Sequence, residues 1–352
     1  MAGRSHLPVL GLLVVGCWLN GCHGEATTPL PAPRAIGLAD RFYDVAAIDA
    51  DRAVVVGYGG KILLTTDGGY TWTLPASGTD RALYSVDFVD GLNGWVSGQD
   101  GILLRTTDGG QSWTRLPSPT AVYMFAIDFL DLQHGWAVGD RSLMLETHDG
   151  GATWTVRKVS PVGSEAAAED IASAEPVLYD VHFLTRDVGW IVGEFGKILH
   201  TTDGGTTWRA QQESLLGGEI VDVLDIPTFF GARFPSEREG VAAGLDGKIA
   251  RTTDSGASWK FDPMRLEYPI ADPLFQPFLA PDGSGWAVGA AGEVVRLSAP
   301  GQAWERYRLG MEVATWLRAM DWSDAENGWI VGGFGLILHT KDGGNTWVPA
   351  IA

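Results

Sequence analysis

The chain has 352 residues, of which 45% are hydrophobic and 19% are charged, and it contains 47 glycines and 15 tryptophans. This balance excludes a disordered protein and indicates a globular, β-rich fold with many turns. The formal net charge of −18 argues against a nucleic-acid partner, because phosphate binding depends on clustered lysines and arginines.

Residues 1–21 have the features of an export signal. Arg4 precedes an apolar run, residues 7–19, that is too short to span a bilayer. The run ends in the sequence LNGC at residues 19–22, which resembles the lipobox of bacterial lipoproteins. The resemblance implies cleavage before Cys22 and acylation of its thiol. Cys17 is a second candidate that leaves a shorter apolar run, and an ordinary secretory signal is the alternative.

The stretch that follows, residues 22–40, is rich in Pro, Ala and Thr and predicts a semi-rigid tether. Beyond Cys17 and Cys22 the sequence has no cysteine, so the body of the chain can form neither a disulfide nor a thiolate metal site. The sequence contains no recognisable zinc motif or phosphate loop, and we predict no metal and no cofactor. We expect a monomer, held by its lipid on the periplasmic side of a bacterial membrane.

From residue 41 onward, one unit repeats seven times. Each copy contains a β-rich run, a segment like GW-x-VG, a segment like G-x-I-L and a closing Trp. Room for four short strands in a repeat of this length is typical of a propeller blade. We predict an all-β fold, a seven-bladed β-propeller of four-stranded antiparallel blades over residues 41–352. Its repeats end near Trp72, Trp113, Trp154, Trp208, Trp259, Trp304 and Trp347.

Six of the seven units carry Ser/Thr-x-Asp-x-Gly-x-x-Trp, which resembles the Asp-box, a turn between the third and fourth strands of sialidases and many other propellers. A short Asp side chain can accept hydrogen bonds from nearby backbone N–H groups, and Gly supplies a positive φ. We therefore predict that these carboxylates stabilise turns and do not catalyse: Asp67, Asp108, Asp149, Asp203, Asp254 and Asp342. The sixth unit, LSAPGQAW, lacks the Asp.

One repeat position, eight residues before each closing Trp, is mostly polar. It holds Leu64, Arg105, Glu146, His200, Arg251, Arg296 and His339. We predict that the three arginines, together with His200 and His339, contribute to a partner-binding surface. The competing interpretation is that these side chains lie at strand ends beside the turn and are simply solvated.

Two segments interrupt the repeat and are further candidates, because loops on a rigid scaffold often carry function. Residues 160–176 are acidic and Ala-rich. In the fifth unit, we expect IPTFFGARFPSERE to form an exposed insertion between the first and second strands. It would present Phe229, Phe230, Arg233, Phe234 and Arg238, and aromatic and Arg side chains are common interface anchors. The alternative is that the phenylalanines fold back onto the propeller.

The pattern GW-x-VG-xx-G-x-I-L-x-T-x-DGG-xx-W, as in GWIVGEFGKILHTTDGGTTW at residues 189–208, resembles the photosystem II stability and assembly factor family. The resemblance covers residues 41–348. It implies a seven-bladed propeller that helps to assemble the photosystem II reaction centre in the thylakoid lumen, as a lipoprotein in cyanobacteria. It also implies that an arginine-rich surface binds the partner.

These observations predict a non-catalytic, lipid-anchored binding platform that assists a membrane protein complex. Two alternatives remain open, a sialidase-like glycoside hydrolase with Asp-boxes and an accessory subunit of an envelope transporter. A sialidase site requires three arginines on a carboxylate, a Tyr nucleophile and an acid. The sequence ARFP around Arg233 faintly resembles the arginine signature of that family, but it lies in the fifth repeat instead of at the start of the first.

Overall fold

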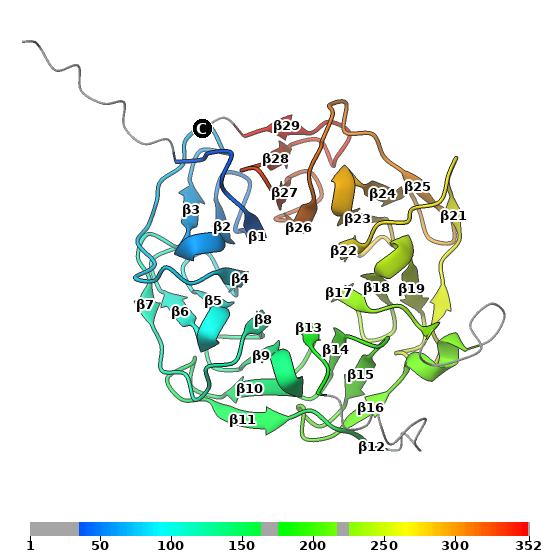
Figure 1. The fold of residues 1–352 in the computed structure, drawn as a ribbon, viewed down its shortest axis with the longest axis horizontal. Helices are drawn as coiled ribbons and strands as arrows, with labels where there is room; N and C mark the ends of the chain where they lie inside the picture. The colour runs from blue at the N-terminus through cyan, green and yellow to red at the C-terminus, as the bar shows by residue number, and fades with distance from the viewer. Residues whose placement is uncertain (1–34, 163–174, 217–224, 351–352) are drawn as a thin grey trace, which may run out of the picture. The chain divides into compact units, whose positions relative to one another are not determined.

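The computed structural model describes residues 35–162, 175–216 and 225–350. In these ranges the chain forms seven β-sheets around a central axis (Figure 1). The predicted seven-bladed β-propeller is thereby confirmed. The export signal, Cys17, Cys22 and most of the tether lie outside the described residues, as does most of the acidic segment 160–176.

Each blade places its first strand beside the central axis (Figure 1). These inner strands are β1 (Phe42–Ala47), β4 (Leu83–Phe88), β8 (Met124–Phe129), β13 (Leu178–Phe183), β17 (Phe229–Arg233), β22 (Leu274–Leu279) and β26 (Leu317–Trp322). The second strands are buried along their whole length, because neighbouring blades cover both of their faces. They are β2 (Ala53–Gly57), β5 (Gly94–Gly98), β9 (Gly135–Gly139), β14 (Gly189–Gly193), β18 (Gly240–Gly244), β23 (Gly285–Gly289) and β27 (Gly328–Gly332).

Short turns lead from the second strand to the third. Five contain a single helical turn: η1 (Tyr58–Gly60), η2 (Gln99–Gly101), η3 (Asp140–Ser142), η6 (Leu245–Gly247) and η7 (Ala290–Gly292). The third strands are β3 (Ile62–Thr65), β6 (Leu103–Thr106), β10 (Leu143–Thr147), β15 (Ile198–Thr201), β19 (Ile249–Thr252), β24 (Val294–Leu297) and β28 (Ile337–Thr340). Another helical turn, η4 (Gln212–Leu215), follows the fourth blade.

The outer edge of the blades varies more than the inner strands. The fourth strands are β7 (Thr114–Arg115), β11 (Thr155–Lys158), β16 (Trp208–Ala210), β20 (Lys260–Phe261), β25 (Trp304–Arg306) and β29 (Val348–Pro349). In the first blade, a bridge from Leu64 to Thr73 replaces this strand. Blades four and six gain a fifth, parallel strand, β12 (Pro161–Val162) and β21 (Met264–Arg265) respectively.

The Gly-Trp pair that opens most second strands explains how the blades pack. The indole of Trp95 stacks on Phe129 of the next blade, with ring centroids 3.7 Å apart. Closing Trp154 meets the same phenyl ring edge-on. Gly135 is required at the adjacent position, because an added Cβ would lie 2.5 Å from the Phe129 ring. Equivalent stacks join Trp136 to Phe183 and Trp190 to Phe234.

The ring closes by contact between complete blades, without a shared strand. β26 to β29 form one blade from consecutive strands, and β1 to β3 form the next. The backbone N–H of Ala47 donates to Asp321 Oδ2 across this junction, over 2.8 Å. Among the described residues, no helix has the length and apolar character needed to cross a bilayer.

Candidate functional site

The six repeated aspartates lie in the turns between the third and fourth strands, and their oxygens bond within those turns. In the fourth blade, Thr207 donates its N–H to Asp203 Oδ1 (2.8 Å) and its hydroxyl to Asp203 Oδ2 (2.6 Å). Thr201 Oγ1 donates to Asp203 and accepts from the N–H of Gly205. The hydroxyl bond from Thr207 lowers the pKa of Asp203. The same bonds recur at Asp67, Asp108, Asp149, Asp254 and Asp342.

The polar repeat position lies on the third strands, one residue per blade, and the structure does not gather these side chains into one pocket. Most pair across the blade with the Trp of the second strand and lie flat on it. The guanidinium of Arg105 lies 5.2 Å from the Trp95 ring, and that of Arg296 lies 4.8 Å from the Trp286 ring. The imidazole of His339 stacks on Trp329 at 3.8 Å. These contacts place planar groups on buried indoles.

The same side chains also bond to the neighbouring blade. Arg105 donates to the carbonyl of Gly150 in the next turn (3.3 Å), and Arg296 donates to Asn345. Arg251 instead bonds within its own blade, in an ion pair with Asp262 at 2.7 Å, and both side chains are mostly buried. Burial lowers the pKa of His339 to about 4 and also lowers the pKa of His200. Each candidate therefore has intramolecular contacts and is not a freely solvated side chain.

The expectation of an exposed insertion in the fifth unit is wrong for most of its residues. Phe229 to Arg233 form β17, the inner strand of the fifth blade, so they lie within a sheet and not between two strands. Phe229 and Phe234 are buried at 0% and 2% exposure, where they pack between blades. Phe230 and Arg233 line the central channel. Arg238, in the following turn, is exposed.

The central channel brings together side chains from all seven blades. In every inner strand the register slips at the second residue, so that this residue is a β-bulge and its side chain turns toward the axis. We call these residues the collar: Tyr43, Tyr84, Phe125, Tyr179, Phe230, Phe275 and Arg318. Neighbouring aromatic rings of the collar lie 5.1 to 5.7 Å apart, from Tyr43 round to Phe275.

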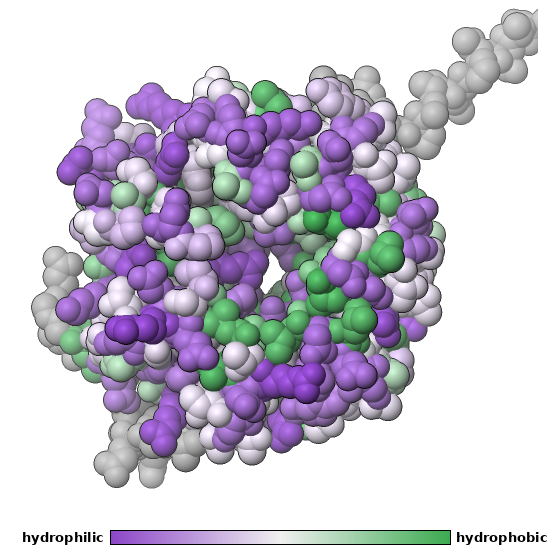
Figure 2. All heavy atoms as spheres, turned by 180° about the vertical axis from the view of Figure 1, so that it is seen from behind, coloured by the Kyte–Doolittle hydropathy of each residue, from purple (hydrophilic) through white to green (hydrophobic). Residues whose placement is uncertain are grey.

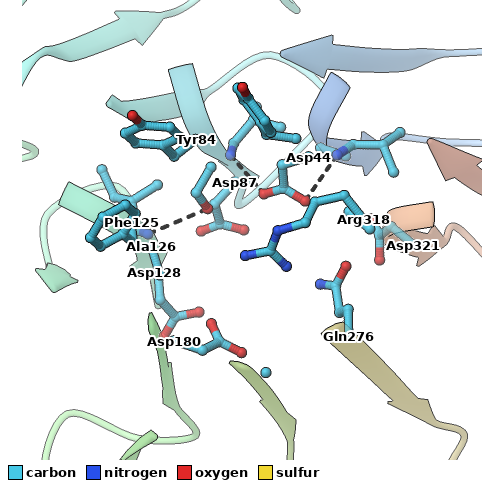
Figure 3. A pocket seen from close by; sticks show the side chains of 18 of the residues that line it. Asp44, Tyr84, Asp87, Phe125, Ala126, Asp128, Asp180, Gln276, Arg318 and Asp321 are labelled. Atoms are coloured by element: carbon cyan, nitrogen blue, oxygen red, sulfur yellow. Dashed lines mark hydrogen bonds between the residues drawn. The ribbon is translucent and has the colours of Figure 1, made fainter. Parts of the chain in front are cut away.

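Carboxylates also project into the central channel, next to the collar (Figure 3). They occupy the third or fifth residue of an inner strand, and each accepts a backbone N–H from the next blade. The pairs are Asp44 with Val86, Asp87 with Phe129, Asp128 with Phe183, Asp180 with Ala232 and Asp321 with Ala47, at 2.7 to 2.9 Å. Gln276 Oε1 accepts from Met320 in the same way. Six of the seven blade junctions are bridged by this bond.

The junction between blades five and six differs. Gly231 takes the third position there, and an added Cβ would lie 2.6 Å from the Phe275 carbonyl oxygen. The two strands therefore approach too closely for a bridging side chain. Arg233 takes the fifth position and adds a buried positive charge to the channel.

The channel perturbs its titratable groups strongly. Burial raises the pKa of Asp44 to about 7 and that of Asp87 to about 6. Burial and the adjacent Asp87 hold the pKa of Asp128 well above its usual range. Burial lowers the pKa of His182, which lies beside Asp128, to about 3. Burial opposes the charge of Arg233, but the surrounding carboxylates, Asp180 first, raise its pKa overall. Within the described ranges, the acidic and His side chains form no group that could hold a metal ion.

The sequence-based predictions above do not include this channel, although the sequence carries a signal of it. The residue after the first apolar position of each inner strand reads Tyr, Tyr, Phe, Tyr, Phe, Phe and Arg in chain order. Five aspartates follow one or three residues later. Aligning the seven units on their first strands instead of their closing tryptophans would have revealed both sets.

A family model described as "Photosynthesis system II assembly factor YCF48" matches residues 32–122, 117–208, 168–261 and 264–350. The chain is 28% identical over 178 residues to the photosystem II assembly protein Ycf48 of Synechococcus sp. strain JA-3-3Ab, covering 50% of this chain and 49% of that protein. It is 25% identical over 193 residues to the photosystem II assembly lipoprotein Ycf48 of strain CC9902, covering 45% and 57%. The chain thus spans about half the length of the curated relatives it matches.

Among solved structures, one described as YCF48 bound to D1 peptide superposes with a TM-score of 0.65 at 20% identity, over 87% of this chain and 94% of that chain. This likeness supports the fold alone. Because the family model matches nearly all of the propeller, the chain belongs to the YCF48 family of photosystem II assembly factors.

Proposed function

We propose that the protein is a non-catalytic, lipid-anchored platform on the periplasmic side of a bacterial membrane, where it binds and helps to assemble a membrane protein complex. The family match across the whole propeller is the observation that carries this proposal. The name of one relative as an assembly lipoprotein agrees with acylation of Cys22. In a photosynthetic organism, the protein would face the thylakoid lumen. Labelling with a fatty acid followed by peptide mapping would locate the lipid on Cys22, on Cys17 or on neither.

The proposed partner contacts lie at two separate places around the ring. Arg105 on β6 and Arg296 on β24 are on opposite sides of the central axis (Figure 1), and each faces the turn of the next blade. Their guanidinium groups lie on indoles and make single hydrogen bonds of 3.3 Å. Arg105 Nε is enclosed, so the N–H groups available to a partner are the terminal ones. Arg251 is a weaker donor, because its ion pair with Asp262 would have to break. Arg238 contributes an exposed positive charge in the turn after β17.

The test is partner capture by a double variant, Arg105→Gln/Arg296→Gln. Crosslinking in intact membranes, followed by mass spectrometry, would first identify the partner. A D1 peptide is the first synthetic probe where the organism makes photosystem II, since a structural relative is described with one. We expect the variant to bind the captured partner roughly tenfold or more weakly, because two charge-assisted contacts are lost. Its melting temperature should stay close to that of the parent.

The matched control is Arg265→Gln, which removes an equally charged but exposed side chain paired with Glu305. It should bind as the parent does. Equal binding by the parent and the Arg105/Arg296 variant would remove this surface from consideration. Turnover of a sialoside or a glucan by the purified protein would instead favour the glycoside hydrolase alternative.

A further inference from the structure

The central channel is a candidate binding site separate from the surface proposed above. It encloses a cavity of about 130 Å³ beside the carboxylates, and the collar borders a second space of about 260 Å³. Both exceed the room that one water molecule needs. From the other side of the disc, Figure 2 shows an opening at the centre of the molecule, with apolar side chains gathered on part of its rim.

Three carboxylates offer an unused oxygen to this cavity. Asp87, Asp128 and Asp321 each accept a backbone N–H at Oδ2. Apart from the backbone N–H of the following residue, which approaches Asp87 and Asp321, no described residue donates to the Oδ1 atoms of these three carboxylates. These atoms are not among the enclosed polar atoms without a partner. His182 Nδ1 lies 3.8 Å from Asp128 Oδ1, which is too far for a hydrogen bond. The Oδ1 atoms are therefore acceptors that face open space.

A second observation indicates which chemistry suits the cavity. Arg318, the one basic member of the collar, points its guanidinium into the cavity (Figure 3) and lies 5.2 Å from the Phe275 ring. Among the described residues, neither Arg318 nor Arg233 forms an ion pair within 4 Å or a side-chain hydrogen bond. The collar thus already holds one guanidinium against an aromatic face. The remaining aromatic rings offer the same face to another cation.

The balance of charge favours a cation over an anion. Five aspartates and two arginines line the cavity, so negative charge is in excess once the carboxylates are ionised. A bare metal ion is not favoured, because no cluster of ligands suited to one occurs in the described ranges. The acceptors are dispersed around the axis, which suits a ligand with several N–H donors on an extended body.

We propose that the channel binds a guanidinium or alkylammonium group, which passes the aromatic collar and donates hydrogen bonds to the free oxygens of Asp87, Asp128 and Asp321. The cation is a small free amine, or it is a basic side chain on an exposed segment of a partner. The inference does not depend on the proposed assembly function, which uses other residues.

Binding should strengthen as the pH rises from 5 to 8. A cation favours ionised carboxylates, and the raised pKa values of Asp44, Asp87 and Asp128 mean that these groups release protons when it binds. The other charged or titratable groups facing them are Asp180, His182, Arg233, Arg318 and Asp321, with the collar tyrosines Tyr43, Tyr84 and Tyr179. His182 stays neutral over this range, because its pKa is about 3.

The experiment is calorimetric titration of the purified full chain in detergent. One arm uses agmatine, which carries a guanidinium and an ammonium group. The other uses a capped Gly-Ser peptide with one central arginine, against the same peptide with citrulline. We expect binding of agmatine or of the arginine peptide, with proton release, and none of the citrulline peptide. Binding of agmatine identifies a free cation as sufficient, and binding of the arginine peptide alone identifies a partner side chain.

Variants then locate the site. Asp87→Asn/Asp321→Asn keeps an acceptor for the backbone while removing two charges, and should weaken binding roughly tenfold or more. Arg233→Gln should tighten it, whereas the same change at an anion site would weaken it. Asp203→Asn, in a turn of the outer rim, is the control and should not alter affinity. Unchanged affinity in the Asp87/Asp321 variant, weaker binding by Arg233→Gln, equal binding of the citrulline peptide, or no binding at millimolar concentration would each overturn the proposal.

Discussion

The propeller uses aspartate in two regions with opposite electrostatics. In the outer turns, Asp203 and its equivalents lie in solvent and accept bonds from a hydroxyl and an N–H of their own turn, which lowers their pKa values. In the channel, Asp44 and its neighbours also accept backbone N–H groups, but from the next blade, and burial raises their pKa values. Asp203 accepts three hydrogen bonds, whereas Asp44 accepts two. The channel aspartates therefore combine burial with fewer hydrogen bonds, and burial is the larger cause of their raised pKa values.

The comparison shows that a repeated motif and a functional cavity can use the same residue for different purposes. The turn aspartates bond locally, so that each of the six blades that contain one carries its own network. The channel aspartates bond across blades, so that no blade completes its network alone. Only the second arrangement brings charges from distant parts of the chain together, and it does so at a cost in desolvation.

The largest effect should come from Asp44→Asn, measured as the free energy of unfolding against pH. Asp44 has a folded-state pKa of about 7, raised above the value near 3.9 of an unfolded chain. The folded state therefore holds an extra proton between about pH 4 and 7, and the stability it confers is lost as the pH rises through this window. A shift of three units corresponds to about 4 kcal/mol.

The asparagine introduced by this change does not titrate. Its side-chain oxygen can still accept the N–H of Val86, whereas the N–H of Val45 loses the acceptor that Asp44 Oδ1 provides. The variant should therefore gain on the parent by a few kcal/mol between pH 4 and 8, and be the more stable protein at pH 8. Urea unfolding at several pH values measures this difference. Parallel profiles for the two proteins would contradict a raised pKa at Asp44 and weaken the contrast with the outer turns.

An intermediate effect is expected from Thr201→Val in the fourth outer turn. The Thr201 hydroxyl is buried, accepts the N–H of Gly205 and donates to Asp203. Valine preserves the shape but leaves the Gly205 N–H without its acceptor, which should cost about 1–3 kcal/mol. Thr202→Val, at the exposed neighbouring position, is the matched control and should change stability little. A similar loss in both variants would mean that replacing a hydroxyl with a methyl group, and not the loss of this hydrogen bond, is responsible.

The sequence predicted the outer turns and the blades well, but not the channel. Asp203, Gly205 and Trp208 lie within six residues, so their pattern is visible in each unit. The collar and channel aspartates come from seven separate strands, and the bulge at the second residue breaks the alternation by which a strand face is recognised. In the fifth unit, the sequence predicts an exposed insertion that includes FFGAR, whereas these residues form the inner strand β17. Gly231 is in fact needed for close strand contact.

The smallest effect, and the one that separates the two kinds of aspartate most directly, should come from Asp203→Asn. Its folded-state pKa is lowered, so the ionised form contributes stability that is present above the unfolded pKa and lost as the pH falls. The variant should be less stable than the parent by about 1 kcal/mol at pH 7, since one oxygen still accepts the Thr207 N–H. The deficit should disappear toward pH 2, the reverse of the trend for Asp44→Asn.

The sixth blade supports a small effect of Asp203→Asn on stability, because it retains a fully buried Trp304 without any aspartate in its turn. A deficit that persists unchanged at acidic pH would show that the carboxylate's charge has no part in holding the turn.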